Sequence, residues 1–297
     1  MDKKTAALLV TVLLCVFSSL AIGQIGAPKP PSAMVYLPVA VAGPKNAPVG
    51  GLKKDNFVLL EDNIEQTVVT FYEPNSRIDV DIILALNALQ KGRADQNSIK
   101  VREAVENFRQ LGNSQNRYNI EEMSHGPNGV YDAISRHINR LVDTSIAPRK
   151  ALVVITDGFE SSGGEPVKAL QEYARRFDVP IYILFAVDAS SSGGGPSDNI
   201  LAIGRGGDGG GYEDLTKWTG GSLHQGDIDT QLIPLMEGLA KHFKNQYVLG
   251  FRSTNDARDD KWRKLEVKIK APEPVGGVAE KDMKVQVRDR YFVSKPK

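Results

Sequence analysis

The stretch from Lys150 to Gly158 reads Lys-Ala-Leu-Val-Val-Ile-Thr-Asp-Gly, and it decides the fold. Its continuous apolar run, Leu152–Ile155, is typical of a strand that is buried on both faces, as in a parallel sheet. The run ends in Thr-Asp-Gly, where we expect the chain to turn toward a helix. Ligands of open α/β sheets bind just past the carboxyl ends of the strands, so Asp157 is predicted to stand at a binding edge.

Strand and helix patterns alternate around this stretch. Val80–Leu86 and Val179–Val187 are predicted to be two further buried strands. Apolar residues recur at helical spacing in four segments, which are Val101–Leu111, Val130–Leu141, Val167–Phe177 and Ile228–Phe243. Alternating strands and helices predict an α/β domain with a Rossmann-like, doubly wound, mostly parallel sheet.

The two ends of the chain have strand patterns instead. The first, Met34–Tyr72, contains apolar runs separated by Gly, Pro and Asn turns. Toward the other end, Gln246–Phe251 forms one apolar run, and later segments alternate apolar and polar residues as half-buried strands do. The simplest architecture inserts the α/β domain, residues 77–245, into a small β-sandwich formed by residues 24–76 and 246–297.

The first residues have the features of a secretory signal peptide. Lys3 and a second lysine precede the apolar run Ala6–Phe17, and small residues follow it. This run is shorter than the about 20 apolar residues that a membrane span needs. We therefore expect cleavage between Gly23 and Gln24, which removes residues 1–23. The mature chain is predicted to be secreted or periplasmic and to have no membrane span.

Cysteine content and charge exclude several kinds of site. Cys15 is the only cysteine, so the mature chain is expected to have no disulfide, thiolate metal site or cysteine nucleophile. A lipoprotein signal would place a small residue directly before this cysteine, whereas Leu14 stands there. The 37 basic and 36 acidic residues nearly balance, which gives no electrostatic reason to expect a nucleic-acid partner.

Five segments together point to a known family. They are Gly51–Asp62, Gly129–Ile134, Ile155–Gly158, Leu215–Gly221 and Gln246–Phe251. In this order and spacing they resemble the von Willebrand factor A-related domain of secreted bacterial proteins, notably those of acidobacteria. The resemblance covers nearly all of the mature chain. It implies a Rossmann-like domain with a metal-ion-dependent adhesion site, which holds a divalent cation in that family.

That adhesion site is degenerate in this sequence. The resemblance implies an Asp-x-Ser-x-Ser motif after the first strand, where this chain has Ala85-Leu86-Asn87-Ala88-Leu89, and a threonine where it has Asn128. Only Asp157 keeps the family's residue. We expect no resident cofactor, with Mg²⁺ or Mn²⁺ on Asp157, Asn87 and Asn128 as the alternative, because such cations prefer oxygen ligands. Without a cation, both asparagines are expected to stabilise turns.

Nearby acidic residues do not replace the missing ligands. Asp79 and Asp81 precede the ligand end of their strand by about 16 Å at a rise near 3.3 Å per residue. Asp132 is expected in the first turn of a helix, where the macrodipole favours a carboxylate.

Other conspicuous residues have structural explanations. The glycine-rich segment 193–211 lacks the Gly-Lys-Ser/Thr of a phosphate loop and is expected to be a flexible loop. Trp218 and Trp262 are expected to anchor the core. The four histidines show no zinc-binding spacing, and His125 lies nearest the Asn128 loop. No Gly-x-Ser-x-Gly elbow is present, so we expect no enzyme, and an unrecognised hydrolase remains an alternative.

These observations predict a secreted, non-catalytic binding or adhesion module whose partner is a protein. The alternative is a metal-free structural scaffold, in which the β-sandwich or the glycine-rich segment makes the contacts.

Overall fold

The computed structural model describes residues 34–86, 96–123, 129–147, 149–157, 164–187 and 209–295. The chain divides into two compact units, Met1–Pro31 and Ser32–Lys297, and every described residue belongs to the second. The signal-peptide prediction for residues 1–23 therefore lies outside the described residues.

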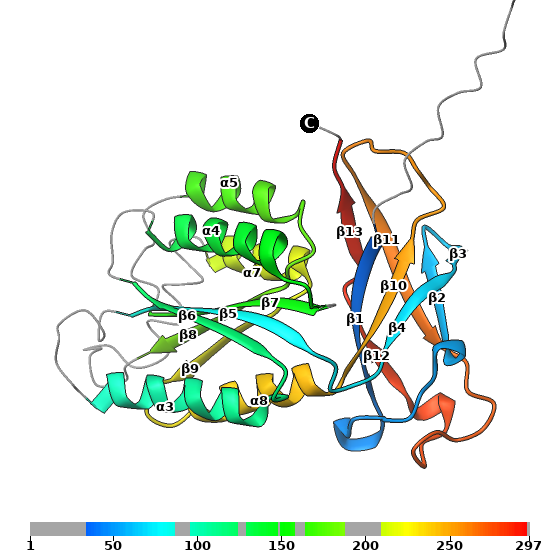
Figure 1. Ribbon diagram of the computed structural model, residues 1–297, viewed down its shortest axis with the longest axis horizontal. Coiled ribbons are helices and arrows are strands. Elements are labelled where there is room, and N and C mark those ends of the chain that lie inside the picture. Colours follow the sequence, from blue (N-terminus) through cyan, green and yellow to red (C-terminus); the bar gives the residue numbers. More distant parts are fainter. Residues whose placement is uncertain are drawn as a thin grey trace, which may run out of the picture. The chain divides into compact units, whose positions relative to one another are not determined.

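A parallel five-stranded sheet forms the centre of the α/β part (Figure 1). Its strands are β5 (Ile78–Ala85), β6 (Arg117–Glu122), β7 (Arg149–Thr156), β8 (Ile181–Val187) and β9 (Leu223–Asp227). They lie in the order β6-β5-β7-β8-β9, and every neighbouring pair is parallel. Relative to chain order this is 2-1-3-4-5, a doubly wound arrangement in which the winding direction reverses between β5 and β7.

Helices cover both faces of this sheet (Figure 1). One face carries α3 (Gln96–Leu111) and α8 (Leu232–Lys244), and the other carries α4 (Gly129–Thr144), α5 (Gly164–Ala174) and α7 (Gly209–Thr219). Gly220, with φ of +86°, ends α7 in the left-handed conformation that glycine adopts without strain. The predicted α/β class is confirmed.

The central strand β5 explains why two helix layers are needed. All eight of its residues are buried. Ile82 and Leu84 pack into the core under α3 and α8, whereas Ile83 and Ala85 pack into the core under α4, α5 and α7. A strand with apolar side chains on both faces is stable only when both faces are covered.

The two ends of the chain form two antiparallel four-stranded sheets. One sheet has the order β12-β1-β10-β4, with β12 (Lys284–Gln286), β1 (Met34–Ala42), β10 (Gln246–Arg252) and β4 (Val68–Tyr72). The other has the order β13-β11-β2-β3, with β13 (Arg290–Val293), β11 (Lys261–Ile269), β2 (Phe57–Glu61) and β3 (Ile64–Gln66). Short 3₁₀ turns occur at Pro44–Asn46, Lys54–Asn56 and Glu280–Asp282. Both sheets combine N- and C-terminal strands, as predicted.

The chain leaves the antiparallel sheets after β4, forms the α/β part and returns at β10. β4 and β10 are neighbours, with Val248 opposite Tyr72, and the whole parallel sheet lies between them in the sequence. The junction is closed by backbone contact, because Asn75 N donates to Lys244 O at 2.7 Å.

Sequence patterns missed the two edge strands of the parallel sheet. β6 reads Arg-Tyr-Asn-Ile-Glu-Glu and β9 reads Leu-His-Gln-Gly-Asp, so neither has an apolar run. The last helix also begins at Leu232 rather than at Ile228, because a turn after β9 occupies these positions. In that turn, Asp227 Oδ1 accepts a hydrogen bond from Thr230 N at 3.0 Å.

Tyr247 connects the core of the sandwich to a loop. Its side chain is fully buried, its hydroxyl donates to Val49 O at 2.8 Å, and it accepts from Leu52 N at 3.1 Å. Phe57 and Phe71 pack against its ring at centroid distances of 5.2 and 5.9 Å. The loop's backbone is therefore satisfied by a side chain from β10.

Replacing Tyr247 by Phe should destabilise the protein by about 1–3 kcal/mol, because it leaves a buried N–H and a buried carbonyl without a partner. The measurement is the free energy of unfolding in urea. Tyr72→Phe is the matched control, since Tyr72 is only half-buried and its hydroxyl has no hydrogen bond to the described residues. Equal stability of the two variants would contradict this role of Tyr247.

Candidate functional site

The carboxyl edge of the parallel sheet contains the point where the winding direction reverses. β5 and β7 are neighbours there, with Ala85 opposite Thr156. The chain leaves β5 toward α3 on one face of the sheet, and it leaves β7 toward α5 on the other face. In open α/β sheets, connections that diverge in this way leave a crevice at the strand ends, which is where such sheets bind their ligands.

Asp157 lies at this reversal point. It directly follows Thr156, the last residue of β7, which lies opposite Ala85 at the end of β5, and its side chain is half-buried. The other two predicted ligands, Asn87 and Asn128, lie outside the described residues. Their described chain neighbours are Leu86 and Gly129, the first residue of α4. Of the three predicted ligands, only Asp157 therefore belongs to the described residues.

Aromatic side chains pack near this edge. Tyr131 in α4 stacks on Tyr212 in α7 at a centroid distance of 6.0 Å, and Phe185 of β8 meets Tyr212 edge-on at 5.7 Å. All three rings are buried. They join the first turns of α4 and α7 to the carboxyl half of β8, so the scaffold beneath the crevice is a packed aromatic cluster.

Over the described part of the chain, no group of three or more His, Cys, Asp or Glu side chains is arranged to hold a metal ion. The predicted cation site would use one carboxylate and two amides, and both amides belong to residues outside the described ranges. Oxygen donors of this kind suit Mg²⁺ or Mn²⁺, although one carboxylate provides little charge for either ion.

A buried charged network lies under α4, away from this edge. Asp81 is fully buried in β5, and its Oδ2 lies 2.5 Å from His137 Nδ1 and 2.8 Å from Arg140 Nε. His137 is also buried, and its Nε2 lies 2.9 Å from Glu121 Oε2 on β6. We name Asp81, His137, Glu121, Arg140 and Arg136 the α4 charged network.

The hydrogen bonds of this network connect two strands to one helix. His137 uses one ring nitrogen toward Asp81 and the other toward Glu121, so it bridges β5 and β6. Arg136 binds Glu121 through two nitrogens, at 2.9 and 3.2 Å. These bonds, followed by the contact with His137, hold the pKa of Glu121 below its ordinary value, although partial burial opposes the effect.

The sequence contained a signal for this network, but the spacing of apolar residues alone did not reveal it. Asp81 lies within the buried strand β5, and His137 stands on the apolar face of α4 next to Ile138. A buried carboxylate needs charged or hydrogen-bonding partners, and these two features together point to such a contact. Asp81 and His137 are buried, whereas the two arginines and Glu121 reach the surface. The network has the features of a structural contact between β5, β6 and α4.

A groove of about 840 Å³ follows the free edge of β9. It is bounded by the end of α7, by α8 and by the segment after β12. His224 and His242 both line it, and burial is the main cause that lowers the pKa of each. The same groove therefore includes surface from the parallel sheet and from the antiparallel strands.

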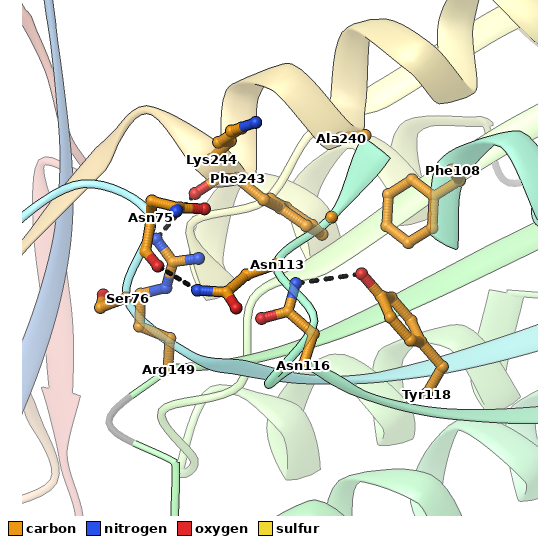
Figure 2. A pocket seen from close by; sticks show the side chains of 11 residues that line it. Asn75, Ser76, Phe108, Asn113, Asn116, Tyr118, Arg149, Ala240, Phe243 and Lys244 are labelled. Carbon is orange, nitrogen blue, oxygen red and sulfur yellow. Dashed lines mark hydrogen bonds between the residues drawn. The ribbon is translucent and has the colours of Figure 1, made fainter. Parts of the chain in front are cut away.

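A small pocket of about 10 Å³, lined in part by polar side chains, lies at the amino-terminal edge of the parallel sheet (Figure 2). This edge is opposite the carboxyl edge that carries Asp157. Arg149, Asn75 and Asn113 gather there, and Asn113 Nδ2 donates to Asn75 O at 2.5 Å. Asn116 Nδ2 donates to the hydroxyl of Tyr118 at 3.0 Å on the other side of the pocket. A space of this volume holds about one water molecule.

The remaining predictions have mixed outcomes. His125 and residues 193–208 of the glycine-rich segment lie outside the described residues. Trp218 and Trp262 are half-buried rather than core residues, and they contact each other edge-on at 5.7 Å between α7 and β11. Asp132 does lie in the first turn of α4. No described helix has the length and apolarity to span a membrane.

Comparison with known proteins adds little beyond the fold. No protein-family model and no curated protein matches the chain. Solved structures do match, among them that of the conserved hypothetical protein BatB from Bacteroides thetaiotaomicron, with a TM-score of 0.35 and 14% sequence identity. That match covers 56% of this chain and 98% of BatB. A similarity this low supports no argument about activity or partner.

Fold and site together define a class. The protein is an α/β protein with a doubly wound parallel sheet that is inserted between two neighbouring strands, β4 and β10, of one of its two antiparallel sheets. Its reversal point carries Asp157.

Glu121→Gln should reduce stability near neutral pH and lose this effect in acid. A carboxyl whose pKa is lowered by folding stabilises the protein above its ordinary pKa, near 4.5, and this stabilisation disappears as pH falls through the lower, folded value. The measurement is the free energy of unfolding of both proteins from neutral pH to about pH 3, where their difference should vanish.

Glu65→Gln is the control for this comparison, because Glu65 is exposed and has no ion pair within the described ranges. Its difference from the unmodified protein should stay small at every pH. A destabilisation by Glu121→Gln that persists unchanged in acid would contradict the assigned charge contact.

Proposed function

We propose that this protein is a secreted, non-catalytic binding module of the von Willebrand factor A type, whose crevice at the ends of β5 and β7 receives a protein partner. The observation that carries the proposal is the position of Asp157, directly after β7 at the reversal point of a doubly wound parallel sheet. This location is the general ligand-binding position of such sheets.

The support comes from the scaffold as well as from Asp157. The aromatic cluster of Tyr131, Tyr212 and Phe185 fixes the helices beside the crevice, so the loops that follow β5 and β7 start from rigid elements. Binding residues are often found on loops that a rigid scaffold positions. The resemblance in sequence supplies the adhesion role, and the predicted signal peptide supplies secretion.

The proposal includes a divalent cation at Asp157, in a site that has lost most of the family's ligands. Asp157 would contribute the one carboxylate, and Asn87 and Asn128 would contribute amide oxygens. A partner's acidic side chain would then complete the coordination of Mg²⁺ or Mn²⁺, because hard cations accept carboxylate, amide and water oxygens together.

Titration of the purified protein with Mg²⁺ and Mn²⁺ tests the cation. Binding to the folded state alone should stabilise it by about 2.7 kcal/mol at a concentration 100 times the dissociation constant, and a chelator should reverse the rise in melting temperature. Asp157→Ala should abolish both the calorimetric heat and this rise.

Asp143→Ala is the matched control, since Asp143 is an exposed carboxylate in the last turn of α4, at the other end of the same domain. It should leave cation binding unchanged. If neither ion produces heat or a shift in melting temperature, the cation has no part in the function.

A metal-free scaffold is the second candidate, and the groove beside β9 favours it. This groove takes surface from α7 and α8 and from the segment after β12, so a partner seated there would contact both sheet systems without reaching Asp157. Partner binding that survives both the chelator and Asp157→Ala would support this candidate over the adhesion site. Turnover in a broad substrate screen would instead favour an unrecognised hydrolase.

A further inference from the structure

A second cavity, of about 60 Å³, lies where the amino-terminal ends of β7 and β8 meet β1. The cavity lies at the opposite end of β7 from Asp157, which follows the carboxyl end of that strand. Its lining combines the apolar side chains of β1 with an unusual number of charged groups. The charged residues are Arg149, Lys150, Asp178 and Arg288.

The charges in this cavity do not balance. Arg288 forms an ion pair with Asp178, whose other oxygen accepts a hydrogen bond from Tyr36 N at 3.1 Å. Each oxygen of that carboxylate therefore already accepts one hydrogen bond, from Arg288 or from the backbone. Within the described ranges, Arg149 and Lys150 have no carboxylate partner. The cavity thus has two positive charges that no acidic side chain neutralises.

Arg149 is the more constrained of these two cations. It is 3% exposed, and its Nη1 donates to Phe243 O at 2.7 Å and to Gln246 O at 3.3 Å. These carbonyls belong to the end of α8 and the start of β10, and a helix C-terminus partly compensates a positive charge. Burial without a carboxylate partner lowers the pKa of Arg149 to about 10.

Two buried guanidinium N–H groups have no acceptor. Arg149 Nε and Arg288 Nε are both buried and neither makes a hydrogen bond to the described protein. A buried donor without a partner is costly, and more so when it carries charge. Arg149 lines both this cavity and the water-sized pocket of Figure 2.

We propose that this cavity binds a small inorganic oxyanion, phosphate or sulfate, through Arg149, Lys150 and Arg288. A guanidinium presents a planar fork of donors that matches an oxyanion, and an ammonium adds a point charge. The volume is several times the about 10–15 Å³ that one water molecule needs, and it is too small for a nucleotide or a peptide. The occupant supplies the negative charge that the lining of the cavity lacks.

This site is separate from the crevice at Asp157, and it has a structural consequence. Its three cations come from β7 and from the segment between β12 and β13, so the anion links the inserted domain to the antiparallel strands. Binding should therefore appear as greater stability of the folded protein.

Calorimetric titration with inorganic phosphate, and separately with sulfate, tests the proposal, alongside thermal unfolding at low millimolar anion. Ionic strength is held constant with sodium chloride, because salts also act on stability without binding. The expected result is saturable binding and a saturable rise in melting temperature. Lys150→Gln should weaken the affinity about tenfold, because it removes one charge-assisted contact.

The matched control is Lys264→Gln, which removes the same charge from an exposed position on β11 that does not line the cavity. It should bind as the unmodified protein does. The proposal is overturned if the anions act no differently from chloride, if the effect does not saturate, or if the two lysine variants behave alike. Arg149→Lys keeps the charge and loses the planar fork of donors. It should therefore also weaken binding, and normal affinity in that variant would equally overturn the assignment.

Discussion

The structure depends on closing a very long insertion within one hydrogen-bonded ladder. β4 and β10 are adjacent and antiparallel, yet the entire parallel sheet with its helices lies between them in the chain. The two crossing points must therefore stay close together. Asn75 N bonds to Lys244 O there, and Arg149 bonds to the carbonyls of Phe243 and Gln246. A buried arginine at this position ties the start of β7 to the end of α8 and the start of β10.

This constraint also explains the opposite character of the two edges of the parallel sheet. The amino-terminal edge faces the junction and is filled with fixed polar contacts, including Arg149 and the asparagines of the small pocket (Figure 2). The carboxyl edge faces away from the junction, and the connections after β5 and β7 diverge from it. A doubly wound sheet thus separates a structural edge from an edge that is available for binding.

The sequence predicted the elements that are buried on both faces, and it missed those defined by tertiary contacts. β5, β7 and β8 are apolar runs, which only a covered strand can sustain. β6 and β9 are polar, half-exposed edge strands that are held by pairing with β5 and β8. Their own residues therefore show no regular pattern of apolar side chains. At the site, Asp157 could be placed because a strand end fixes it. The contact between Asp81 and His137 joins residues that are distant in sequence, and local spacing carries no information about it.

The insertion has a consequence for how the chain reaches its native state. Closing a loop costs conformational entropy before any distant contact compensates for it, and the cost increases with loop length. β4 and β10 can pair cheaply only after the intervening domain has collapsed and brought Asn75 close to Lys244. The α/β domain has its own two cores and can form from local contacts, whereas each antiparallel sheet needs strands from both ends of the chain. We therefore expect folding to proceed from the middle of the chain outward, with the antiparallel sheets forming after the α/β domain.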